Sequence, residues 1–91
     1  MANIHIKKNH RLDPETIHNK VQELADKLAK DLSAEYKWEK NNLVFKRSGA
    51  SGIVRIGEQQ VEVEVKLGLM LSPLKGSIEK SITEYLDKKL V

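Results

Sequence analysis

Three histidines near the start of the chain are the side chains best suited to binding a metal. His5, His10 and His18 could act with an acidic neighbour, Asp13 or Glu15. None of them has a second ligand at the i, i+4 spacing of a strong zinc motif. The pattern indicates structural or surface histidines, and we expect neither a metal nor another cofactor.

Catalytic groups are scarce in the rest of the sequence. Glu62 and Glu64 lie two residues apart and could do acid–base work if a pocket raised one of their pKa values. An open sheet face supplies no such pocket, so we interpret both carboxylates as solvated. The chain has no cysteine, and no serine lies in a nucleophile-elbow context. We therefore predict that the protein is not an enzyme.

A glycine-rich segment beside two cations is a candidate anion site. Lys46 and Arg47 precede SGASG at residues 48–52, and Arg55 follows. Backbone amides of such a segment can form an anion-binding nest. In phosphate loops, however, the glycines lead into a helix, whereas residues 53–56 have the pattern of a strand. A hairpin turn is favoured, with these three cations as candidate anion contacts.

The clearest secondary-structure signal lies in residues 61–75. Aliphatic residues at alternate positions predict a strand with one covered face, while charged residues occupy the face toward water. The covered positions are Val61, Val63, Val65, Leu67, Leu69 and Leu71, and the charged ones are Glu62, Glu64 and Lys66. After this strand, Ser72 and Pro73 predict an N-cap and the first turn of a closing helix.

The other elements follow from the same patterns. Ile4 and Ile6 predict a short first strand, and residues 13–15 have the acidic cap and proline of a helix start. Alternation over residues 36–56, with turns near 41–42, 48–52 and 57–60, predicts consecutive hairpins. The apolar stripes of the two helices are Ile17, Val21, Leu24, Ala25, Leu28 and Leu32, then Leu74, Ile78, Ile82, Tyr85, Leu86 and Leu90.

Together these elements predict an α+β fold in the order β-α-β-β-β-β-α. Both helices need an apolar partner, and the meander offers one apolar face. We therefore expect two layers, with both helices on one face of a curved antiparallel sheet. No linker or repeat interrupts the chain, so residues 1–91 are expected to form a single domain.

Composition narrows the class of protein. The 16 basic and 13 acidic side chains give a net charge of +3, weaker than the basic stripe of a nucleic-acid binder, so nucleic acid is disfavoured as a partner. No apolar run predicts a membrane span, and the first ten residues lack the apolar core of a secretory signal. A cytoplasmic location is expected.

The exposed face of the predicted sheet carries some apolar residues among its charges. Val44, Ile53 and Met70 would form a small adhesive patch if the hairpins bring them together, and the corner at residues 69–74 is also available. Single apolar residues are normal on a surface. Two interpretations therefore stay open: a solvated face, or an interface with a second copy or a hydrophobic partner.

A set of short motifs extends over nearly the whole chain. They are IHI at residues 4–6, FKRSG at 45–49 followed by Gly52, LGLML at 67–71, PLK at 73–75, and Ile78, Ile82 and Leu86. In this order they resemble the polyhydroxyalkanoic acid system family, small bacterial proteins linked to granules of storage polyester. The resemblance implies association with polyhydroxyalkanoate granules or their regulation, and it transfers no catalytic residue.

Three hypotheses on function result. The first is a non-catalytic protein that acts through its apolar surface on the polyester granule or a granule-associated protein, as a homo-oligomer. The second is RNA or ribosome binding, because α-β-β-β-α is the order of double-stranded-RNA-binding domains, although Lys75 is the single cation that opens the last helix. The third is a carrier of a small hydrophobic ligand, for which 91 residues leave little room.

Overall fold

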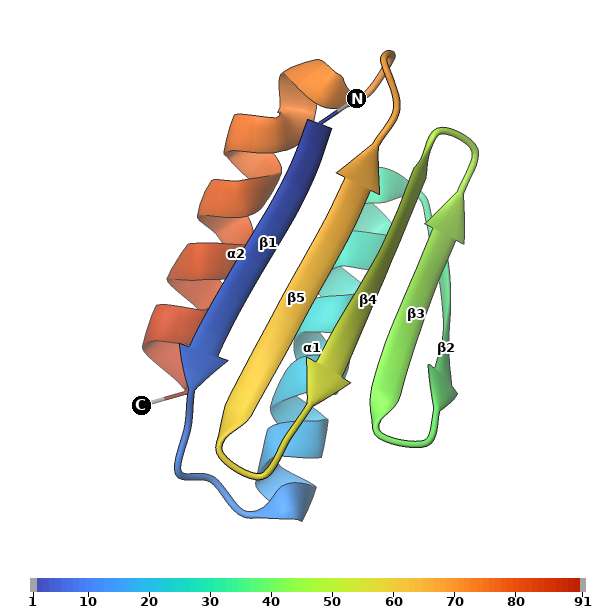
Figure 1. The fold of residues 1–91 in the computed structure, drawn as a ribbon. Helices are drawn as coiled ribbons and strands as arrows, with labels where there is room; N and C mark the ends of the chain where they lie inside the picture. Colours follow the sequence, from blue (N-terminus) through green and yellow to red (C-terminus); the bar gives the residue numbers. More distant parts are fainter. Residues whose placement is uncertain (1, 91) are drawn as a thin grey trace.

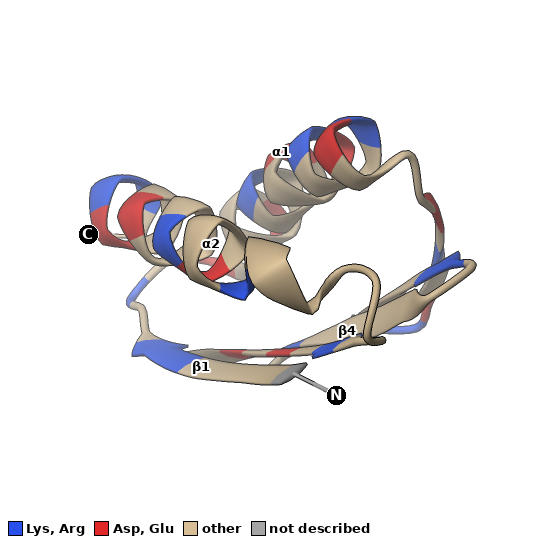
Figure 2. Cartoon of the chain, turned by 90° about the horizontal axis from the view of Figure 1, so that it is seen from above, with Lys and Arg blue, Asp and Glu red and all other residues tan. Residues whose placement is uncertain are grey.

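The computed structural model describes residues 2–90, which form a five-stranded antiparallel sheet and two α-helices (Figure 1). The elements in chain order are β1 (Ala2–Asn9), α1 (Pro14–Leu32), β2 (Glu35–Glu39), β3 (Asn42–Arg47), β4 (Ala50–Ile56), β5 (Gln60–Leu67), the 3₁₀ helix η1 (Ser72–Leu74) and α2 (Lys75–Lys89). Figure 2 shows both helices on one side of the sheet. The predicted α+β class, element order and two-layer arrangement are confirmed.

The sheet has the strand order β1-β5-β4-β3-β2. Strands β2 to β5 are consecutive hairpins, as predicted, and β1 pairs with β5 along its full length, from Ala2 opposite Leu67 to Asn9 opposite Gln60. The first strand is longer than its two isoleucines predict, because β5 supplies backbone partners beyond the apolar positions. β5 therefore lies between β1 and β4, and side chains from these three strands meet on both faces.

Helix α1 begins where the sequence predicts. The Asp13 carboxylate accepts hydrogen bonds from the backbone N–H of Thr16 at 3.2 Å and from its hydroxyl at 2.6 Å, and these bonds hold the pKa of Asp13 below its usual value. All six residues of the predicted stripe are buried. The helix is thus fixed both at its start and along the face that covers the sheet.

The core lies between the helices and one face of the sheet. The four apolar side chains of β5, at positions 61, 63, 65 and 67, are at most 3% exposed. They belong to one cluster with the stripe of α1 and with Ile78, Ile82 and Leu86 of α2. Neither helix within residues 2–90 has the length and apolar content needed to cross a membrane.

The alternation of covered and open-face residues in β5 ends at Leu67, the last residue of the strand. This residue is paired with Ala2 and Ala50, the first residues of the two neighbouring strands, and within residues 2–90 neither strand is paired with β5 beyond it. Gly68 then donates its N–H to Gly49 O at 2.7 Å, and the chain leaves the sheet. The prediction that Leu69 continues the covered face is wrong, because the chain has left the sheet by Gly68 and the side chain of Leu69 is exposed.

The start of α2 also differs from the prediction. Ser72 does not cap the helix; its hydroxyl donates to Leu69 O at 3.1 Å, and η1 comes between the loop and α2. Pro73 lies in this 3₁₀ turn, which begins at Ser72, rather than in the first turn of the α-helix. The serine therefore closes the loop on itself and fixes the path of residues 69–72.

Candidate functional site

The loop between β5 and α2 exposes three large apolar side chains. Leu69 is 79% exposed, Met70 92% and Leu74 43%. We call these three residues the apolar corner. In Figure 1 the loop extends past the ends of the strands, at the same end of the sheet as the β3–β4 turn.

The apolar corner is held by contacts at its base. Leu71 points inward, packs against the core cluster, and lies 3.7 Å from the position that a Cβ on Gly49 would take. The N–H of Leu71 donates to Gly68 O at 3.1 Å, and that of Leu74 donates to Leu71 O at 2.9 Å. The exposed side chains thus stand on a hydrogen-bonded turn rather than on an extended loop.

The predicted apolar patch is only partly assembled. Val44 and Ile53 are cross-strand partners on the open face of the sheet, where both are half-buried. Met70 does not lie beside them, because β5 ends three residues earlier. The open face and the apolar corner are therefore two separate surfaces.

Glu62 and Glu64 lie in a cluster of charged side chains rather than standing alone in water. The imidazole Nε2 of His5 lies 2.6 Å from Glu62 Oε2 and 3.7 Å from Glu64 Oε1. Arg55 Nη1 lies 3.2 Å from Glu62 Oε1 and 3.1 Å from Glu64 Oε2. Each carboxylate thus directs one oxygen toward the histidine and the other toward the arginine.

This arrangement has an electrostatic consequence for one of the two acids. The hydrogen bond with His5, followed by the charges of Lys7 and Arg55, holds the pKa of Glu62 below its usual value. Glu62 is therefore not poised as a proton donor near neutral pH. The one set of His, Asp and Glu side chains within residues 2–90 with metal-binding geometry is His5, Glu62 and Glu64, whose ligand atoms lie within 4.8 Å of one another.

The three candidate anion contacts do not come together. Lys46 is exposed on the open face, whereas Arg47 points to the covered side, where its Nη1 donates to Leu32 O at 2.7 Å and its Nε to Ser48 O at 3.0 Å. Arg47 thus satisfies a carbonyl at the end of α1. Arg55 is engaged by the two carboxylates described above.

The other two histidines have structural partners. His10 is buried; its Nδ1 accepts a hydrogen bond from Leu12 N and its Nε2 donates to Gly57 O, both at 3.2 Å. It joins the β1–α1 loop to the β4–β5 turn. His18 stacks on Trp38, with ring centroids 3.9 Å apart and the planes inclined by 17°.

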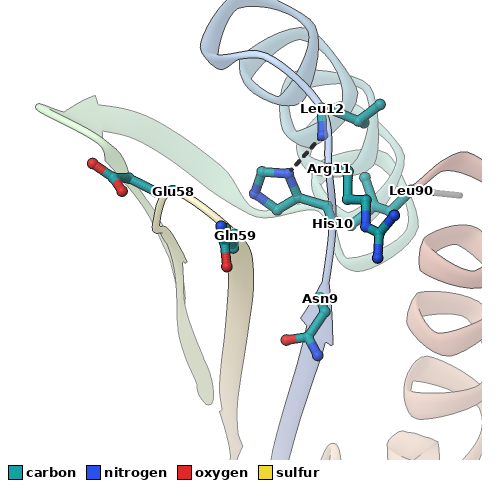
Figure 3. A pocket seen from close by; sticks show the side chains of 7 residues that line it. All are labelled: Asn9, His10, Arg11, Leu12, Glu58, Gln59 and Leu90. Carbon is teal, nitrogen blue, oxygen red and sulfur yellow. Dashed lines mark hydrogen bonds between the residues drawn. The ribbon is translucent and has the colours of Figure 1, made fainter.

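A shallow hollow of about 800 Å³ lies at the end of the sheet away from the apolar corner, and Figure 3 shows its lining. It is open to solvent, and the polar ends of the side chains drawn there point in different directions instead of converging on one point. The residues that line it are Asn9, His10, Arg11, Leu12, Glu58, Gln59 and Leu90. A ligand would find no set of groups arranged around it.

The interior offers little room for the proposed hydrophobic ligand. A void between the helices and the sheet, bordered by Leu28, Phe45 and Ile78, measures about 10 Å³. This is the space of roughly one water-sized probe. The packing there gives no support to a carrier function.

Comparison with known families shows to which family the chain belongs. Residues 4–90 match the family described as "Putative polyhydroxyalkanoic acid system protein". The chain belongs to this family. No curated protein matches its sequence. The family match confirms the resemblance of the motifs and links the chain to the polyhydroxyalkanoic acid system, while its description specifies neither a binding surface nor a mechanism.

Two features of these surfaces are not predicted from the sequence, for different reasons. Leu69 has the parity of a covered residue, and the signal against it is Gly68 together with the Ser72–Pro73 breaker inside the apolar run. The proximity of His5 to Glu64 has no local signal, because the two residues meet only through the pairing of β1 with β5.

Proposed function

We propose that this protein is a non-catalytic component of the polyhydroxyalkanoic acid system that attaches to the polyester surface through the apolar corner. The observation that carries the proposal is the nearly complete exposure of Leu69 and Met70 on a structured turn. Membership of a family named for the polyhydroxyalkanoic acid system supports the choice of a polyester as the ligand, and a polyester inclusion presents an apolar surface. An apolar surface of this kind binds exposed apolar side chains such as those of the apolar corner.

The energetics favour this use of the corner. Burying a leucine or methionine side chain contributes about 1.5–3 kcal/mol. The hydrogen bonds of Gly68 and Leu74 already hold the turn, so little conformational freedom is lost when the corner docks. Two to three such side chains would contribute about 3–9 kcal/mol before the costs of association, which favours reversible rather than permanent attachment.

The open face is less suited to the same task. Val44 lies opposite Lys37 as well as Ile53, and Ile53 lies opposite Glu64. Docking this face on polyester would remove water from those charged neighbours, which costs free energy. At the apolar corner, Leu69 and Met70 are followed by Leu71 and Ser72, and the nearest charge along the chain is the exposed Lys75 after Leu74, so fewer charged neighbours would lose water.

Co-sedimentation with purified polyhydroxyalkanoate granules tests the proposal. The test variant is Leu69→Ser combined with Met70→Ser, and the matched control is Val44→Ser combined with Ile53→Ser on the open face. We expect the wild-type protein to bind at both low and high salt, because the contact is apolar. The corner variant should lose binding at least tenfold, and the control should bind like the wild type.

The other outcomes contradict the proposal in distinct ways. Absence of binding by the wild-type protein would exclude attachment to polyester. Loss of binding only in the control would assign the contact to the open face. Circular dichroism melts should show that both double variants keep the fold, since Leu69 and Met70 are exposed and Val44 and Ile53 lie outside the buried core cluster.

A further inference from the structure

A second surface, on the open face of the sheet, has the geometry of a metal site. We propose that His5, Glu62 and Glu64 bind one divalent transition-metal ion of the zinc class. This inference is independent of the proposed attachment to polyester. It comes from the way in which β1, β5 and β4 orient these side chains.

The ligand atoms converge from neighbouring strands. His5 and Glu64 are cross-strand partners, and Glu62 is two residues from Glu64 on the same face of β5. A tetrahedral zinc ion, with bonds of about 2.0–2.2 Å, holds its ligand atoms about 3.3 Å apart. The separations of 2.6 and 3.7 Å from His5 Nε2 to the two carboxylates lie on either side of that value. All three ligand atoms lie within 4.8 Å of one another, and rotation of the glutamate side chains would have to bring the two carboxylates together around one ion.

Arg55 supports this arrangement from behind. It binds Glu62 Oε1 and Glu64 Oε2, the two oxygens that do not face His5. The guanidinium therefore orients both carboxylates without occupying the position between them and the imidazole. Outer hydrogen bonds of this kind, made to the ligating groups themselves, are typical of protein metal sites.

The chemistry of the donors selects the class of ion. One neutral imidazole nitrogen and two carboxylate oxygens suit zinc, cobalt(II) or nickel(II) better than calcium or magnesium, which prefer oxygen alone. Three protein ligands leave a coordination position for water. Besides Arg55, a second competing cation is Lys7, whose Nζ lies 3.9 Å from Glu62 Oε2 and whose side chain is about half exposed. A lysine at this distance can swing away when the ion binds.

Titration of the tag-free, metal-free full chain with Zn²⁺, followed by NMR of the histidine rings, tests the proposal. The chain has three histidines, so each ring serves as a reporter. We expect one ion per chain, with the ring signals of His5 shifted and those of His10 and His18 unchanged. Calorimetry should show binding weakened at least tenfold in His5→Ala and in Glu64→Gln, and unchanged in the control His18→Ala.

Two results would overturn the proposal. One is the absence of saturable Zn²⁺ binding by the wild-type chain. The other is equal affinity in His5→Ala and His18→Ala, which would show that the ion binds elsewhere. Melting curves without metal should be similar for the wild type and His5→Ala, because the side chain of His5 is half exposed; this keeps a loss of binding distinct from a loss of fold.

Discussion

The two faces of the sheet are built from the same strands but are stabilised differently. On the covered face, Val61, Val63 and Leu67 are completely buried in one apolar cluster. On the open face, Glu62 and Glu64 make specific contacts with charged groups of two neighbouring strands. The covered face depends on which positions are apolar, whereas the open face depends on which strands are neighbours.

The largest effect is expected when a lysine is introduced on one face of the sheet in one variant and on the other face in a second variant. Val63→Lys puts an unpaired charge into the core, and we expect loss of the folded state, because the cost is a large part of the roughly 5–15 kcal/mol of a typical domain. Ile53→Lys puts the charge on the open face, opposite Glu64, and should leave the fold intact. Circular dichroism and thermal melts measure both. A similar loss of structure in the two variants would show that the open face is part of the core.

A smaller effect is expected at Gly52, on the covered face of β4. A Cβ there would lie 3.1 Å from both Glu64 O and Phe45 Cδ2, closer than side-chain carbons normally approach. Gly52→Ala should therefore lower the free energy of unfolding by about 1–3 kcal/mol, as overpacking does elsewhere. Urea denaturation measures the change.

The matched control is the adjacent residue on the opposite face. Ser51→Ala, at an exposed position, should change the free energy of unfolding by less than about 0.5 kcal/mol. Equal costs at residues 51 and 52 would mean that the strand backbone, rather than the packing of Phe45 over Gly52, sets the stability of β4.

The same contrast explains what the sequence predicts and what it does not. Alternation and helical spacing are properties of each segment alone, so the element order, the cap at Asp13 and the buried stripe of α1 follow from local pattern. The cluster of His5 with Glu64 requires the position of β1, which local pattern does not contain. The prediction for Leu69 is wrong for a related reason: its parity is right for a strand, but within residues 2–90 the pairing of β5 with its neighbours ends at Leu67.

In the helix layer, one substitution is expected to stabilise the protein instead of destabilising it. Helix α1 has a side-chain cap, whereas α2 starts without one and has Gly76 in its first turn. Apart from its chain neighbours and the backbone of its own helix, no atom of the described residues lies within 4 Å of a Cβ built on Gly76. Gly76→Ala should therefore raise the free energy of unfolding by about 0.5–1 kcal/mol, since alanine favours the helix and restricts the unfolded chain.

The control for this gain is a glycine that the fold requires. A Cβ on Gly68 would lie 3.1 Å from Gly49 O, so Gly68→Ala should destabilise the protein where Gly76→Ala stabilises it. Thermal melts of the two variants give the signs directly. A stabilising Gly68→Ala would show that the chain can leave β5 by another path, and the geometry of the apolar corner would then be less constrained than its contacts indicate.

The smallest effect concerns the open face at acid pH. Because the hydrogen bond with His5, with the charges of Lys7 and Arg55, lowers the pKa of Glu62, its contribution to stability is complete above the usual value of 4.5. That contribution is lost as the pH falls through the lowered value in the folded protein. Glu62→Gln should therefore be less stable than the wild type near neutral pH, and the difference should shrink on acidification. The effect is small because solvent screens exposed ion pairs.

Urea denaturation at several pH values measures this convergence, and Glu58→Gln is the control. Glu58 is an exposed carboxylate in the β4–β5 turn, away from the sheet face. If the difference between wild type and variant shrinks equally for residues 58 and 62, the acid dependence reflects overall charge rather than the contacts of His5 and Arg55. If it shrinks only for Glu62, the open face owes its order to specific pairing across β1, β5 and β4, because Glu62 differs from Glu58 in those contacts.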